Sequence, residues 1–203
     1  MSLDLVAATG NMKKLAEIKA ALKGTGIEVA SMREAGYTCD LPEETGDTFE
    51  GNAAIKAEAV AEALGVAALA DDSGLMVLAL NGAPGVMSAR YAGKQGDDAA
   101  NNRKLLEEMK NVPEGKREAK FVCVMALARP WKKTLFFTGE VKGRILFEPR
   151  GTSGFGYDPL FYSPELKKTF AEVPSGKAEI SHRVRALERV VAFLKKEASH
   201  GRR

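Results

Sequence analysis

The spacing of apolar residues predicts a strand, a turn and a helix at the start of the chain. Residues 3–8 are mostly apolar, and Thr9-Gly10-Asn11 interrupts this run. From Met12 to Leu22, apolar residues recur at intervals of three and four, which is the period of one helix face. The turn aims the N-terminus of that helix, with its N–H groups and positive dipole end, beyond the strand.

Similar patterns along the rest of the chain predict an α/β protein. Short apolar runs predict strands over residues 27–31, 66–70, 75–80, 119–128 and 134–141. Capping residues predict further helices that begin after Asp47 or Thr48, after Asp97 and after Ser181. Because strands alternate with helices early and pair as a hairpin later, we expect a mixed sheet with flanking helices. The segment Pro113-Glu114-Gly115 is the expected boundary between two lobes.

Two adjacent carboxylates, Asp71 and Asp72, lie between two of the predicted strands, where we expect a tight turn. Like charges side by side are costly unless a cation or hydrogen-bond donors compensate them. Carboxylates on a rigid turn also suit Mg²⁺, which is commonly shared with substrate phosphates. The alternative is an ordinary turn of Asp, Ser and Gly, and this stretch alone does not decide between the two.

Lys13 and Lys14 lie in the first turn of the first predicted helix. Cations oppose the helix dipole there, so a bound phosphate would account for their position. Two solvated lysines are the alternative, and the GxxxxGK[ST] phosphate loop is absent. On the second helix, Asn52 and Lys56 are four residues apart and therefore share a face.

Glycines and aromatic residues alternate in a second candidate binding segment, residues 151–161. The glycines let the backbone approach a ligand closely, and the rings of Phe155 and Tyr157 offer flat faces for stacking on a planar base. The alternative is an aromatic-rich loop packed on the core. Farther along, His182 and Arg183 lie in the first turn of the last helix, which again places donors at a helix N-terminus.

Composition narrows the class of protein. The chain has 203 residues, of which 45% are hydrophobic, and a net charge of +3. These values are typical of a globular protein and too mildly basic for a duplex nucleic-acid binder. Cys39 and Cys123 belong to no CxxC or His-spaced cluster, so neither a zinc site nor a disulfide framework is indicated. Signal-like and membrane-spanning runs are absent, so we expect a cytoplasmic protein without a membrane or nucleic-acid partner.

Six short motifs stand out along the chain. They are Ala8-Thr9-Gly10-Asn11-x-x-Lys14, Glu43-Glu44-Thr45-Gly46-x-Thr48-Phe49-x-x-Asn52-Ala53-x-x-Lys56-Ala57, Ala70-Asp71-Asp72-Ser73-Gly74-Leu75, Gly82-Ala83-Pro84-Gly85-Val86-x-Ser88-Ala89-Arg90-Tyr91, Gly154-Phe155-Gly156-Tyr157-Asp158-Pro159 and Ile180-Ser181-His182-Arg183. In this order they resemble the inosine triphosphate pyrophosphatase family. The resemblance extends from residue 3 to about residue 197.

The resemblance implies an elongated α/β fold of two lobes around a long mixed sheet, with the active site in the cleft. We therefore expect one domain over residues 1–197 and a polar basic tail over residues 198–203. It also implies a Mg²⁺-dependent homodimer. The expected reaction is hydrolysis of dITP, ITP and XTP to the monophosphate and pyrophosphate, which removes deaminated purine nucleotides from the nucleotide pool.

Individual roles also follow from the resemblance. Asp72 would bind the metal and activate the attacking water, with Glu43 or Glu44 as a further metal ligand. Residues 9–14 would hold the triphosphate and residues 155–158 would surround the base. The expected substrate-binding residues are Thr9, Gly10, Asn11, Met12, Lys13, Lys14, Asn52, Lys56, Ser73, Arg90, Phe155, Gly156, Tyr157, Asp158, Lys177, His182 and Arg183. Among them, Lys177 and Arg183 donate hydrogen bonds but cannot accept them, which favours the 6-oxo group of hypoxanthine over the adenine amino group.

Two other functions are compatible with the residues. A nucleotide-binding or sensing module would keep the phosphate lysines but would need no metal-bound base, and it would release no pyrophosphate. A related pyrophosphatase for modified pyrimidine or standard nucleotides would need a different base pocket. A panel of nucleotide substrates distinguishes that enzyme from one specific for deaminated purines.

Overall fold

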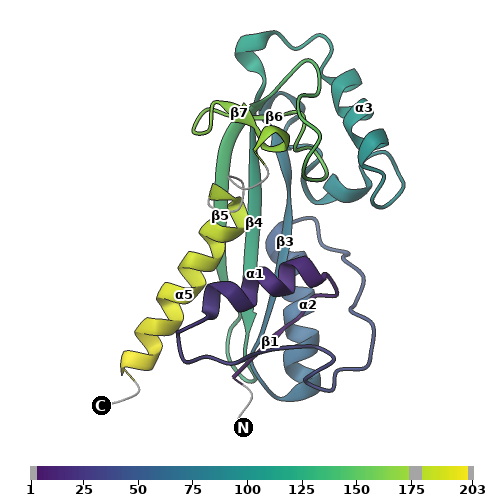
Figure 1. The fold of residues 1–203 in the computed structure, drawn as a ribbon. Helices are drawn as coiled ribbons and strands as arrows, with labels where there is room; N and C mark the ends of the chain where they lie inside the picture. The colour runs from purple at the N-terminus through teal and green to yellow at the C-terminus, as the bar shows by residue number, and fades with distance from the viewer. Residues whose placement is uncertain (1–3, 174–179, 201–203) are drawn as a thin grey trace. The chain divides into compact units, whose positions relative to one another are not determined.

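The computed structural model describes residues 4–173 and 180–200, and Figure 1 shows their arrangement. The strands within these residues are β1 (Leu5–Ala7), β2 (Val29–Ser31), β3 (Ala68–Val77), β4 (Glu118–Ala128), β5 (Leu135–Ile145), β6 (Phe161–Ser163) and β7 (Lys168–Thr169). The longer helices are α1 (Met12–Leu22), α2 (Phe49–Leu64), α3 (Asp98–Glu108) and α5 (His182–His200). None of the described helices is both long and apolar enough to cross a membrane.

The sheet has the strand order β2-β1-β3-β4-β5-β6-β7. Strand β1 pairs in parallel with β2 and β3, whereas β6 runs antiparallel to β5 and β7. The predicted α/β class, with a mixed sheet and flanking helices, is therefore confirmed. The predicted caps are also confirmed for α2, which Thr48 caps, and for α3, which Asp97 caps.

The chain divides into two compact units. Unit 1 contains Met1–Asp72, Cys123–Gly139 and Val184–Arg203, and unit 2 contains Ser73–Val122 and Glu140–Arg183. Strands β3, β4 and β5 therefore each contribute residues to both units. The assignment of residues 1–197 to one domain and of 198–203 to a tail stays a prediction, and α5 continues to His200.

The expected lobe boundary at Pro113 is wrong, because this segment lies inside unit 2. Arg117, which follows it, is 2% exposed. Its guanidinium group donates to the carbonyl oxygens of Met109 and Val112 after α3, and to two more at the end of β5. A segment fixed in this way is no linker, although its Pro and Gly suggested one.

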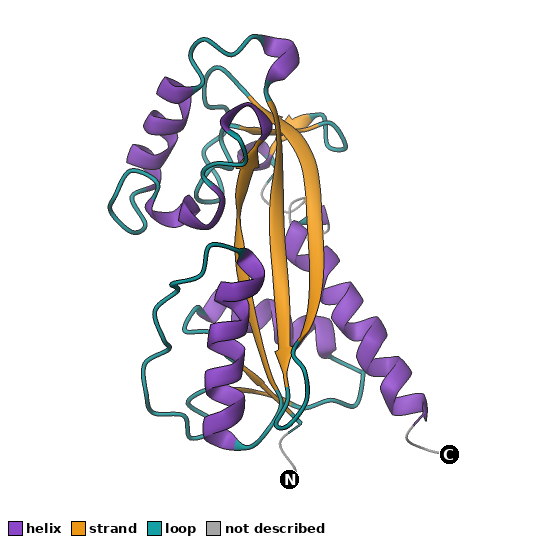
Figure 2. Cartoon of the chain, turned by 180° about the vertical axis from the view of Figure 1, so that it is seen from behind, coloured by secondary structure: helices purple, strands orange, loops and turns teal. Residues whose placement is uncertain are grey.

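Alternate strand residues of unit 1 face two separate hydrophobic clusters. Leu5 and Leu69 pack in one cluster with α1 and α5, whereas Val6 and Ala68 pack in the other with α2. Successive side chains of a strand point to opposite faces, so both faces of this part of the sheet are covered by helices. Figure 1 shows α1 and α5 over one face, and the reverse view in Figure 2 shows α2 over the other.

Strand β3 contradicts the predicted turn at Asp71 and Asp72. A single strand runs from Ala68 to Val77, and Leu78–Leu80 continue as a 3₁₀ turn, where the sequence predicted two strands. Because β3 also pairs with the long strand β4, strand pairing outweighs the turn preference of Ser and Gly. The two carboxylates therefore point to opposite faces of the sheet.

Candidate active site

The N-terminus of α1 is closed by its own cap. The side-chain oxygen of Asn11 accepts hydrogen bonds from the backbone N–H groups of Lys13 at 2.9 Å and Lys14 at 3.3 Å. The Thr9 hydroxyl accepts from the N–H of Asn11 at 3.1 Å. Two N–H groups that we expected to face a phosphate are thus already bonded, which corrects that expectation. The exposed residues beside the cap are Gly10, Met12 and Lys13.

Asp71 lies on the α1 side of β3 and forms an ion pair with Lys14. Lys14 Nζ is 3.0 Å from Asp71 Oδ2, and the Asp71 side chain is 1% exposed against 23% for that of Lys14. The Cys123 thiol approaches the same carboxylate oxygen at 4.0 Å. Because a buried carboxylate needs a compensating charge or donor, Asp71 and Lys14 hold each other in place beside the start of α1.

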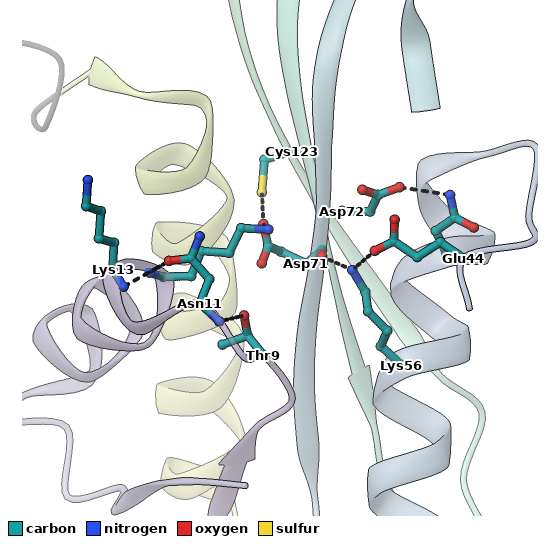
Figure 3. A network of polar contacts seen from close by, with 10 residues as sticks. Thr9, Asn11, Lys13, Glu44, Lys56, Asp71, Asp72 and Cys123 are labelled. Carbon is teal, nitrogen blue, oxygen red and sulfur yellow. Dashed lines mark hydrogen bonds and ion pairs between the residues drawn. The ribbon is translucent and has the colours of Figure 1, made fainter. Parts of the chain in front are cut away.

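Asp72 lies on the opposite side of β3, as Figure 3 shows. It is 7% exposed, and its Oδ2 accepts a hydrogen bond from the side-chain amide of Asn52 at 3.1 Å. The side-chain oxygen of Asn52 accepts in turn from the backbone N–H of Gly46 at 2.8 Å. The amide of Asn52 therefore contacts protein groups at both ends and is completely buried, at 0% exposure.

The structure distinguishes Glu44 from Glu43. Lys56 Nζ donates to Glu44 Oε1 at 2.5 Å and to the backbone carbonyl oxygen of Asp71 at 2.7 Å. Glu43 is exposed, whereas Glu44 is half-buried and is linked through Lys56 to β3 (Figure 3). Of the two residues, Glu44 is therefore the one held next to the strand that carries Asp72.

The carboxylates of unit 1 suit a divalent cation that also binds phosphate. No group of three or more Asp, Glu, His or Cys side chains in the described residues is arranged to hold a metal ion. Mg²⁺ needs fewer protein ligands, because it is usually bound through one or two carboxylates together with waters and substrate phosphates. Asp72 and Glu44 are the two carboxylates that would hold such an ion on the α2 side of β3.

In unit 2, Asp158 fixes the turn that presents Phe155. Asp158 is fully buried, and its Oδ2 accepts from the backbone N–H of Phe155 at 3.0 Å. Gly154 has φ +84°, and a Cβ there would lie 2.2 Å from the same oxygen, so only glycine fits. Phe155 stays 58% exposed on this turn. Phe155 can therefore stack on a ligand, whereas Asp158 holds the loop.

Two residues of α3 that the sequence analysis did not select hold the next glycine of the loop. Asp98 Oδ2 accepts from the N–H of Gly156 at 2.6 Å, and Asn102 donates to the Gly156 carbonyl oxygen at 2.8 Å. They lie four residues apart in the first turns of a capped helix, as do Asn52 and Lys56 on α2. This polar spacing was visible in the sequence and could have identified them.

Tyr157 does not match its predicted stacking role. It is 3% exposed within the core of unit 2, so no ring face is open to a base. Its hydroxyl donates to the backbone carbonyl oxygen of Ser88 at 2.9 Å, and burial raises the pKa of Tyr157. Tyr157 thus fastens the loop to the turn Gly85–Arg90, which ends in the half-buried Arg90.

The first turn of α5 carries His182 and Arg183, the last residues of unit 2. They are 5% and 7% exposed, and the imidazole ring of His182 stacks on Phe121 with ring centroids 5.1 Å apart. An aromatic neighbour on β4 therefore packs against the His182 ring. Ser73 is half-buried and begins the part of β3 that belongs to unit 2. Lys177 lies outside the described residues.

Comparisons with known proteins give similarity along nearly the whole chain. Residues 5–193 match the profile of the Ham1 family. A dITP/XTP pyrophosphatase of Listeria innocua is 50% identical over 187 residues, which are 92% of this chain and 92% of that protein. A dITP/XTP pyrophosphatase of Bacillus licheniformis is 47% identical over 192 residues, with 94% and 97% covered. The structure of the Staphylococcus aureus Ham1 protein has a TM-score of 0.87 and 44% identity, and covers 96% of this chain and 99% of its own.

Proposed function

We propose, since this chain belongs to the Ham1 family, that it is a nucleoside-triphosphate pyrophosphatase for deaminated purine nucleotides. The enzyme hydrolyses dITP, ITP and XTP to the monophosphate and pyrophosphate. The similar proteins named dITP/XTP pyrophosphatases support this reaction. The observation that carries the proposal is the set of carboxylates and lysines around β3, in which Asp72 is oriented by Asn52 while Lys14 is paired with Asp71.

The proposal gives each side of β3 a separate task in hydrolysis. Lys13 and Lys14, at the positive end of α1, attract the triphosphate. Asp72 takes a proton from the attacking water, as a general base held in one direction by the Asn52 amide. We assign Mg²⁺ as the metal and Asp72 with Glu44 as its protein ligands. When bound, Mg²⁺ supplies charge neutralisation on the phosphates.

We assign recognition of the base to residues of unit 2. Phe155 stacks on the purine with its exposed ring. Arg183 donates to the 6-oxo group, as does Lys177, and an adenine amino group would leave these donors unpaired. Asp158 and Tyr157 keep the loop in the conformation that presents Phe155.

We expect a cytoplasmic homodimer, as the resemblance to inosine triphosphate pyrophosphatases implies. Size-exclusion chromatography with light scattering tests the dimer, because a monomeric mass at micromolar concentration would contradict it.

A substrate panel tests the proposed function. The purified protein is incubated with Mg²⁺ and, separately, with dITP, ITP, XTP, dGTP, dATP and dTTP, and pyrophosphate release is followed. We expect the highest kcat/KM for the three deaminated purines. Absence of pyrophosphate with every nucleotide would favour a binding or sensing module. Equal rates with dATP and dITP would contradict the proposed recognition of the 6-oxo group.

A further inference from the structure

Two polar residues of α2 each connect the loop of residues 43–46, which we call the acidic loop, to strand β3. Asn52 contacts the N–H of Gly46 in the loop and the Asp72 carboxylate on the strand. Lys56, one turn later, contacts the Glu44 carboxylate in the loop and the Asp71 carbonyl oxygen on the strand. All of these residues belong to unit 1. We call this pair, Asn52 and Lys56, the α2 clamp.

The chemistry of its partners fixes the direction of the Asn52 amide. The backbone N–H of Gly46 only donates, so it must meet the side-chain oxygen of Asn52. The NH₂ group must then face Asp72, whose ionised carboxylate only accepts. The hydrogen bond therefore orients Asp72 without adding a positive charge next to it.

Close packing ties the loop to the same amide. A Cβ on Gly46 would lie 2.9 Å from the side-chain oxygen of Asn52 and 3.2 Å from its backbone nitrogen. The loop therefore approaches the start of α2 as closely as only glycine permits. Glu44 precedes Gly46 by two residues, and its carboxylate is held by Lys56, which is only 8% exposed. The acidic loop and strand β3 are thus both held by side chains of helix α2.

We propose that Asn52 is a positioning residue for the divalent metal, because the α2 clamp sets the Asp72 and Glu44 carboxylates relative to each other. This inference rests on the proposed function and replaces the direct substrate contact expected for Asn52 from the sequence. Groups that orient metal ligands typically change metal affinity or activity by about 10–100-fold when removed. Loss of Asn52 weakens metal binding first, and nucleotide binding at saturating metal changes much less.

The experiment compares Asn52→Leu with Asn101→Leu. Leucine keeps the approximate shape of asparagine and removes both hydrogen bonds. Asn101 on α3 is also buried, at 1% exposure, and its amide accepts from the N–H of Ala92 at 2.8 Å and donates to the Ala89 carbonyl oxygen at 3.3 Å. Asn101→Leu therefore controls for the loss of a buried side-chain amide that makes two hydrogen bonds. Gly46→Ala is the third variant, since its Cβ would press on the Asn52 side-chain oxygen and displace the loop while the asparagine itself is kept.

Two readouts are required. Binding of Mn²⁺ to the nucleotide-free protein is followed by loss of the free-ion electron paramagnetic resonance signal, and KM for dITP is measured at saturating Mg²⁺. We expect Asn52→Leu and Gly46→Ala to weaken Mn²⁺ binding about 10–100-fold, and Asn101→Leu to leave it unchanged. If Asn52→Leu does not fold, Gly46→Ala alone decides.

Several results would overturn the clamp. These are unchanged Mn²⁺ binding in Asn52→Leu, an equal loss in Asn101→Leu, or no Mn²⁺ binding by the unsubstituted protein. A higher KM for dITP with normal Mn²⁺ binding would instead make Asn52 a substrate contact. Failure of the unsubstituted protein to release pyrophosphate from any nucleotide would reject the proposed function, and the Mn²⁺ titration would still decide the clamp.

Discussion

On the two sides of strand β3, the neighbouring carboxylates of Asp71 and Asp72 have different kinds of partner. Asp71 is paired with the positive charge of Lys14, at 3.0 Å, whereas Asp72 accepts a hydrogen bond from the neutral amide of Asn52, at 3.1 Å. Lys14 brings a positive charge to Asp71, whereas the Asn52 hydrogen bond orients Asp72 through a neutral donor. Adjacent acidic residues in a strand therefore need not form one site, because their side chains point to opposite faces of the sheet.

The largest expected effect is on kcat, and it comes from comparing Asp72→Asn with Asp71→Asn. Asp72→Asn removes the proposed general base and should lower kcat by roughly 10²–10⁴-fold. Asp71→Asn should mainly raise KM for dITP, because it releases Lys14 and leaves the base in place. Steady-state kinetics of both variants check this. Equal losses of kcat would mean that the two carboxylates act together after all.

Stability should separate the two lysines at the start of α1. Lys14→Met leaves the buried Asp71 carboxylate without its ion-pair partner and should lower the free energy of unfolding by about 1–3 kcal/mol. Lys13→Met, at an exposed position in the same turn, should have a much smaller effect. Urea denaturation of both variants measures the difference. Similar values would show that the Asp71 ion pair contributes little to folding.

In the loop of unit 2, we expect Phe155 to contribute to substrate binding and Tyr157 to contribute to stability. Phe155→Ala removes an exposed ring and should raise KM for dITP by the equivalent of about 1–3 kcal/mol, with little change in Tm. Tyr157→Phe removes the hydrogen bond to Ser88 and should lower stability by about 1 kcal/mol while KM changes less. Kinetics and thermal denaturation test both, and an unaltered KM in Phe155→Ala would exclude stacking.

An exposed ion pair gives the smallest expected effect and a reference for the buried one. Glu34 accepts from the Ser31 N–H and pairs with Lys19, and these contacts lower the pKa of Glu34 from its ordinary 4.5 to about 2. A lowered pKa stabilises the fold above pH 4.5, and this contribution disappears as the pH falls toward 2. The Tm difference between wild type and Glu34→Gln should therefore be small at neutral pH and vanish in acid. A difference that grows in acid would contradict this sign.

Local elements of the fold could be predicted because their signals are local. The caps Thr48 and Asp97 start helices in the structure, and the apolar run of residues 119–128 forms the internal strand β4. The continuity of β3 beyond Leu69 could not be predicted, since it depends on pairing with β4, which is distant in sequence. The apparent turn at Ser73-Gly74 was therefore a misleading local signal.

The candidate site was predictable in its residue types but not in its partners. The resemblance assigned the metal and the water to Asp72, but that Asp71 lies on the opposite face and pairs with Lys14 follows only from the strand geometry. The choice of Glu44 over Glu43 depends on contact with Lys56, twelve residues away. Likewise, Phe155 and Tyr157 look equivalent in the sequence, but burial leaves only the Phe155 ring open. Side-chain direction and burial are long-range properties that spacing alone does not contain.

Metal binding by the two aspartate variants tests the central distinction most directly. Mn²⁺ is titrated into wild type, Asp71→Asn and Asp72→Asn, and the free-ion paramagnetic resonance signal is followed. We predict that Asp72→Asn weakens Mn²⁺ binding by at least about tenfold, because it removes a charged ligand, while Asp71→Asn binds as wild type does. Normal binding by Asp72→Asn, or an equal loss in Asp71→Asn, would contradict the assignment of the metal to one side of β3.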